Sequence, residues 1–89
     1  MQHRHIRMTF DDAKEYLHIA ENAYNAGAYQ ESAQIVTRLA YFAADDSNGL
    51  TCSERRELTD GVKRAIGRFT ECPDECTWED MCGLEDLFR

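Results

Sequence analysis

Residues 16–42 constrain the fold of this chain most, because their pattern predicts two amphipathic helices that meet at Gly27. Apolar residues recur at spacings of three and four on both sides of this glycine, which is the repeat of one face of an α-helix. Glycine readily takes the left-handed conformation in which many helices end, so the first helix is expected to stop there. The two helices would then fold back on each other as an antiparallel hairpin.

The first helix is predicted to open at Thr9, three residues before Asp12. A threonine and an acid at this spacing form a capping box, in which each side chain accepts a hydrogen bond from the backbone N–H of the other residue. The helix is expected to bury one apolar face, which consists of Ala13, Tyr16, Leu17, Ala20, Ala23 and Tyr24.

The second helix, predicted over residues 28–44, carries an unusually wide apolar arc. One face holds Tyr29, Ala33, Val36, Ala40 and Ala43, and the adjoining face holds Ile35, Leu39 and Phe42. A helix with so broad an arc must pack on two sides, against the first helix and against a further surface. The next helix or a second copy of the chain is expected to supply that surface. Ile35, Leu39 and Phe42 are therefore candidate protein-binding residues.

The hairpin resembles a single unit of the tetratricopeptide type. The residues at that family's large, leucine, small, glycine, tyrosine and second small positions are Tyr16, Ile19, Ala20, Gly27, Tyr29 and Ser32. The resemblance is confined to residues 16–42, departs from the family at Val36, Leu39 and Ala44, and is not followed by a second repeat. It implies an antiparallel helical hairpin, whereas a peptide-binding groove of the family's kind needs about three stacked repeats.

A third helix is predicted to follow a turn at residues 45–49. It opens with a capping box of Thr51 and Glu54 and should end before Pro73, which disfavours helical geometry in the preceding residue. Gly61 and Gly67 lie inside it, and each weakens a helix by about 1 kcal/mol relative to alanine. Both glycines are therefore expected to mark close contacts between helices.

A short fourth helix is predicted to begin at Thr77, and its apolar residues are Trp78, Met81, Leu84, Leu87 and Phe88. At 89 residues, the chain has room for one domain with a small core. The predicted fold is therefore all-α, a small helical bundle of three main helices plus a short C-terminal helix. Its parts are a flexible arm over residues 1–8, a three-helix body over 9–71 and an acidic, cysteine-bearing segment over 72–89.

The net charge of −7 is concentrated in the C-terminal segment. Residues 71–89 contain one base, Arg89, against the acids Glu71, Asp74, Glu75, Glu79, Asp80, Glu85 and Asp86. An acidic chain is not suited to direct nucleic-acid binding, which needs an excess of Lys and Arg, and favours a protein partner with a basic patch. The chain has no apolar run of the ~20 residues that span a bilayer and no secretory signal, so we expect no membrane contact and a cytoplasmic location.

Four cysteines form a second candidate site, namely Cys52, Cys72, Cys76 and Cys82. The last three follow the spacing Cys-x3-Cys-x5-Cys, which differs from the Cys-x-x-Cys pairs of most zinc sites. Buried or idle thiols are the favoured interpretation. The alternative is a metal-binding or redox-responsive module that holds zinc or an iron–sulfur cluster.

The sequence contains no catalytic motif, such as a glycine-rich phosphate loop, a nucleophile elbow or a His-Glu-x-x-His pair. The chain is therefore predicted to be a non-enzymatic adaptor or regulator that needs no cofactor, binds a protein partner and forms a homodimer. The candidate binding residues are Ile35, Leu39, Phe42, Trp78, Glu79, Asp80, Leu87 and Phe88.

A short acidic helical chain of this type also looks like the small accessory proteins of temperate bacteriophages. That resemblance implies a phage- or mobile-element-encoded modulator of host machinery. Two further roles stay open. The acidic segment is suited to mimicry of nucleic acid, and residues 84–88 are a candidate ligand of a DNA-replication clamp, although they lack the glutamine expected of such ligands.

Overall fold

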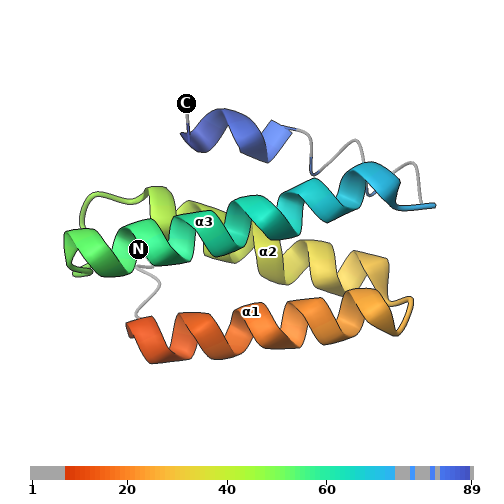
Figure 1. Cartoon of the computed structure of the whole chain (residues 1–89), viewed down its shortest axis with the longest axis horizontal. Helices are drawn as coiled ribbons and strands as arrows, with labels where there is room; N and C mark the ends of the chain where they lie inside the picture. The colour runs from red at the N-terminus through yellow and green to blue at the C-terminus, as the bar shows by residue number, and fades with distance from the viewer. Residues whose placement is uncertain (1–7, 74–76, 78–80, 82, 89) are drawn as a thin grey trace, which may run out of the picture.

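The computed structural model of the protein describes residues 8–73, 77, 81 and 83–88. These residues form the α-helices α1 (Phe10–Asn25), α2 (Tyr29–Ala44) and α3 (Cys52–Arg68) and the 3₁₀ helices η1 (Phe69–Glu71) and η2 (Gly83–Phe88). The three α-helices lie side by side, and η2 runs along one edge of the bundle (Figure 1). The predicted all-α class is confirmed, since the described parts of the chain contain no strand.

Both predicted capping boxes are present and begin their helices where the sequence places them. At the start of α1, the Asp12 N–H donates to Thr9 Oγ1 at 3.1 Å and the Thr9 N–H donates to Asp12 Oδ2 at 3.3 Å. At the start of α3, Thr51 and Glu54 exchange the equivalent bonds at 3.0 and 3.1 Å. Each cap satisfies backbone donors that the helix leaves free and stabilises the fold by about 1 kcal/mol.

Gly27 makes the turn between α1 and α2 with a φ of +87°, in the left-handed region that other residues avoid. The N–H groups of Gly27 and Ala28 donate to the carbonyls of Tyr24 and Ala23, which closes the end of α1. The predicted turn is thus confirmed. The buried hydroxyl of Ser32 on α2 then donates to the Ala20 carbonyl on α1 at 2.7 Å and sets the register of the hairpin.

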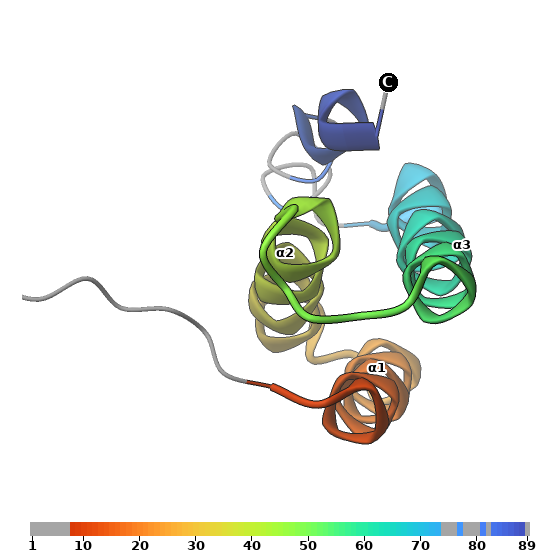
Figure 2. The same cartoon turned by 90° about the vertical axis from the view of Figure 1, so that its left-hand side faces the viewer.

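The wide apolar arc of α2 is explained by its central position. It is in contact with α1, α3 and η2, which lie around it on three sides (Figure 2). The resulting core draws on every helix, and its members are Ala13, Ala20, Ala33, Val36, Leu39, Ala40, Phe42, Ala43, Leu58, Val62, Ala65, Ile66, Phe69, Met81 and Leu84. The second surface that α2 needs is therefore supplied within the chain, by α3 and the C-terminal segment.

The two glycines inside α3 have different surroundings. A Cβ atom on Gly61 would lie 2.7 Å from Leu17 Cδ2, so this glycine allows α1 and α3 to approach each other closely. No such contact exists at Gly67, where a Cβ atom would have nothing within 4 Å. The expectation of close helix contact is therefore confirmed at Gly61 and wrong at Gly67, which is exposed.

A cluster around Tyr24 joins the ends of α1 and α3. The Tyr24 hydroxyl donates to the Arg68 carbonyl at 2.8 Å, and the Tyr24 ring makes edge contacts with Tyr29 and Phe69 at centroid distances of 5.1 and 5.0 Å. The Arg68 guanidinium lies 4.5 Å from the Tyr24 ring centroid and donates to Asn25 Oδ1 at 2.6 Å. Burial, with a smaller contribution from the nearby thiol of Cys72, raises the pKa of Tyr24 above 10.0.

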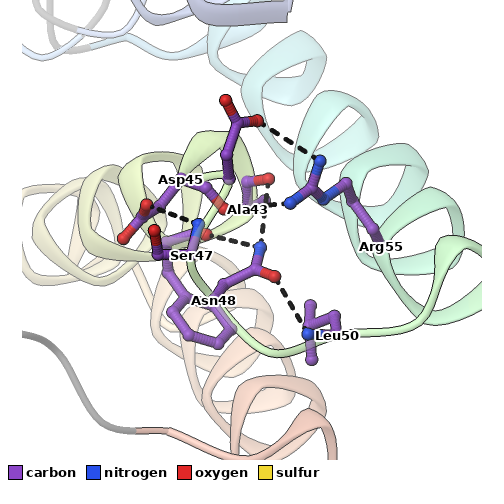
Figure 3. Close-up of polar contacts among 8 residues, drawn as sticks. Ala43, Asp45, Ser47, Asn48, Leu50 and Arg55 are labelled. Carbon is purple, nitrogen blue, oxygen red and sulfur yellow. Dashed lines mark hydrogen bonds and ion pairs between the residues drawn. The ribbon is translucent and has the colours of Figure 1, made fainter.

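The connection between α2 and α3 closes the end of α2 with side-chain hydrogen bonds (Figure 3). Asn48 Nδ2 donates to the Phe42 carbonyl at 3.0 Å, and Asn48 Oδ1 accepts from the Leu50 N–H at 3.0 Å. Arg55 at the start of α3 donates to the Asp45 carbonyl at 3.1 Å. Residues from both helices therefore hold this connection, which satisfies the carbonyls that α2 leaves free.

Candidate protein-binding face

Two of the predicted binding residues on α2 belong to the core. Leu39 is 1% exposed and Phe42 is 3% exposed, while Ile35 is half-buried and packs against the core. The prediction that Leu39 and Phe42 face a partner is therefore wrong for this structure. The physical reason is the small size of the chain, which needs nearly the whole arc of α2 to build one core.

The C-terminal candidates that the structure describes also close the core. Leu87 and Phe88 are half-buried against it, next to the buried Met81 and Leu84. The predicted binding residues Trp78, Glu79 and Asp80 lie outside the described residues. The described part of the C-terminal segment therefore serves mainly to cover α2 and α3, which are the helices that η2 contacts.

The two described cysteines, Cys52 and Cys72, do not meet at one ion. Cys52 is exposed at the first position of α3, and Cys72 follows η1 beyond the other end of that helix. A helix of 17 residues is about 25 Å long, far more than two ligands of one metal ion can span. Cys76 and Cys82 lie outside the described residues, and within the described ranges no three His, Cys, Asp or Glu residues are grouped to hold a metal.

Two of the three large apolar side chains that the described chain exposes lie on α1. Tyr16 is 47% exposed and Ile19 is 45% exposed, and a spacing of three residues places them next to each other on the helix surface. Tyr16 was expected on the buried face of α1, so that expectation is wrong. The core side of α1 is formed by the fully buried Ala13 and Ala20 and by Leu17, which meets α3 at Gly61.

The contacts of α1 define which way Tyr16 and Ile19 point. Each further residue turns a helix by about 100°, so Leu17 and Tyr16 lie on opposite sides of Ala20. Since Ala20 pairs with α2 and Leu17 touches α3, Tyr16 lies on the side of α1 away from α3. Ile19 lies further round on that same side and is 45% exposed.

The register of the hairpin places Ile35 beside this apolar pair. The helices α1 and α2 run antiparallel and rise equally per residue. Ala20 on α1 lies opposite Ser32 on α2. Tyr16, four residues before Ala20, therefore lies at the level of Val36, four residues after Ser32 and next to Ile35. Ile35 lies on the side of Ser32 opposite to the fully buried Val36. We call the surface formed by Tyr16, Ile19 and Ile35 the outer face.

Charged residues surround the outer face. Asp12 precedes Tyr16 by one helical turn, and Glu15 precedes Ile19 by one turn. On α2, Glu31 precedes Ile35 by one turn and Arg38 follows it by three residues. All four are exposed, and three carboxylates with one guanidinium leave the rim with a net charge of −2. The outer face is therefore apolar at its centre and acidic at its edge.

The remaining exposed surfaces differ from the outer face. Tyr41 on α2 is 56% exposed, but six residues after Ile35 it points about 120° away from it. On α3 the exposed outer surface is polar and mainly basic, with Arg56, Lys63, Arg64 and Arg68. Arg55 does not belong to that surface, because it turns to the connection between α2 and α3 and donates to the Asp45 carbonyl and to Asp46 Oδ1.

Sequence reasoning missed the outer face as a site, although one signal for it was present. Ile19 does not belong to the apolar stripe expected for α1, so the periodicity leaves it on the surface. An isolated surface isoleucine is common and carries little information. Only the position of α3 shows that Tyr16 is turned outward to join it, and that position depends on tertiary packing.

The chain matches no family model, and neither curated proteins nor solved structures show a match to it. None of the helices in the described part of the chain is both long and apolar enough to cross a bilayer. What the fold and the site define is a small all-α bundle with an amphipathic surface on its α1–α2 hairpin.

Proposed function

We propose that this chain is a non-enzymatic adaptor or regulator that binds a protein partner through the outer face. The observation that carries the proposal is the pair of Tyr16 and Ile19, each nearly half exposed and adjacent on a helix whose other side is well packed. Large aromatic and aliphatic side chains grouped on a folded surface are typical of protein-interaction sites. A small regulator that acts by binding needs no catalytic centre of its own.

The proposed role is that of the small accessory proteins that the chain resembles in type, which act on the machinery of a host cell. The apolar centre of the outer face would supply binding energy, and its acidic rim would orient the partner. The proposal places binding on α1 and α2. It assigns the described C-terminal residues to the core, where Leu84 and Met81 are buried.

Site-specific crosslinking tests this proposal. A photoreactive amino acid is introduced at Ile19 in one version of the full chain and at Tyr41 in a matched control, and each is exposed to cell lysate. The proposal predicts a partner that is captured from Ile19, identified by mass spectrometry, and then shown to bind the purified chain. Capture that is equally efficient from Tyr41, or no stoichiometric binding by any captured protein, contradicts the outer face as the site.

A further inference from the structure

We infer that the segment of the partner that occupies the outer face is a basic amphipathic helix. This inference rests on the proposed function and deepens it by naming the chemistry of the partner. Three features of the described residues carry it: the two-helix geometry of the face, the sign of the charge at its rim, and the unsuitability of a second copy of this chain.

The geometry favours a helical segment over an extended one. One common way to bind an extended peptide is to add it to the exposed edge of a sheet, and the described residues form no strand to which it could add. Tyr16 and Ile19 on α1 and the half-buried Ile35 on α2 instead lie side by side on two antiparallel helices. A helix that packs along this hairpin contacts all three with the apolar residues of one face.

The rim charge favours a basic segment. Asp12, Glu15 and Glu31 lie one helical turn from the three apolar residues, and Arg38 is the only base among the four rim residues. A partner helix with Lys or Arg on both sides of its apolar face would place positive charge opposite these carboxylates. The net charge of −7 on the whole chain would also speed its encounter with a basic partner.

A second copy of this chain does not provide that chemistry. Two outer faces related by a two-fold axis would bring six rim carboxylates together, and like charges across an interface are unfavourable. The basic surface of α3 does not fit either. The exposed large apolar residues of the described chain are Tyr16, Ile19 and Tyr41, and none of them lies on α3. The basic surface of α3 therefore lacks the exposed large apolar residues that a partner of the outer face would need.

The probe for the test is a synthetic helical peptide with Leu on one face and Lys on the other, and its control carries Glu in place of Lys. Binding to the full chain is measured by fluorescence anisotropy, at low and at high salt. The Lys peptide is expected to bind at least about tenfold more tightly than the Glu peptide at low salt, with the difference reduced at high salt.

Paired variants locate the bound peptide. Tyr16→Ser with Ile19→Ser is expected to weaken binding of the Lys peptide about tenfold, because an interface depends on its few apolar anchors. The matched variant Tyr41→Ser, which removes the most exposed tyrosine, should leave the affinity unchanged. Likewise Glu15→Gln with Glu31→Gln should weaken binding severalfold at low salt, whereas Asp60→Asn with Glu71→Gln, two exposed acids elsewhere, should not.

Several results would overturn the inference. One is equal weakening by Tyr41→Ser, because the peptide would then not be held specifically by the outer face. A second is equal weakening by the control pair of acids, because binding would then follow the overall charge. Another is a sedimentation profile that changes from dimer to monomer in the Tyr16→Ser, Ile19→Ser variant, because the occupant would then be a second copy. If the partner captured from Ile19 contacts this face with a segment that lacks basic residues, the inference fails while the adaptor proposal stands.

Discussion

At the scale of single residues, Tyr24 makes the most consequential contacts between helices. Its hydroxyl donates to the Arg68 carbonyl, and its ring lies between Tyr29, Phe69 and the Arg68 guanidinium. Tyr24→Phe keeps the ring contacts and removes the hydrogen bond alone. We expect this variant to lower the free energy of unfolding by about 1 kcal/mol in chemical denaturation near neutral pH.

The same residue predicts a loss of stability in alkaline solution. The folded state raises the pKa of Tyr24 above 10.0, so the folded chain holds this proton more tightly than the unfolded chain does. The contribution of the neutral Tyr24 hydroxyl to the free energy of unfolding is fully present below pH 10 and decreases as the pH rises above 10. The difference in unfolding free energy between wild type and Tyr24→Phe should therefore stay constant up to about pH 10 and narrow as the pH rises above it. A difference that stays constant above pH 10 would contradict the assignment.

At the scale of elements, features set by neighbouring residues were predictable from the sequence, whereas features set by packing between helices were not. The capping boxes at Thr9 and Thr51 and the turn at Gly27 involve residues within a few positions of each other, and the structure confirms all three. The side of α1 that faces solvent depends on where α3 packs, which the periodicity of α1 does not contain. Tyr16 was assigned to the core for that reason.

The width of the apolar arc on α2 was correctly recognised, and of the two covers expected for it, the next helix is the one that the structure shows. The sequence shows that Leu39 and Phe42 need a cover, and cannot show whether the cover is a partner or a later part of the same chain. In the structure, both side chains are buried within the chain itself. The glycines of α3 also differ in a way that the sequence does not show. Gly61 lies against Leu17, whereas a Cβ atom on Gly67 would have nothing within 4 Å.

The role of η2 as part of the core predicts a large effect of a single substitution. Leu84 is buried whereas Leu87 is half-buried. Leu84→Ala is expected to lower the free energy of unfolding by about 2–3 kcal/mol through lost burial and a residual cavity. Leu87→Ala should lower the free energy of unfolding clearly less. Urea titration of the two variants and the wild type measures both losses. Equal and negligible effects of both substitutions would show that η2 does not pack against α2 and α3 in solution.

At the scale of the whole molecule, the described part of the chain buries or half-buries most of its large apolar residues in one core, and it exposes Tyr16 and Ile19 on the acid-rimmed outer face of the α1–α2 hairpin. This division explains why the outer face, and not the arc of α2, is the proposed binding site. A small bundle with α2 at its centre tolerates exposed apolar side chains only at its periphery, where they do not compete with the core.

The central claim is tested most directly by mapping the bound partner on the chain with NMR. The isotope-labelled full chain is titrated with the partner captured from Ile19, and amide chemical-shift changes are recorded for every assigned residue. We expect the changes to concentrate around Tyr16, Ile19 and Ile35, with little change along the exposed surface of α3. Changes centred on Arg56 and Lys63, or spread through the core around Leu39 and Leu84, would contradict it.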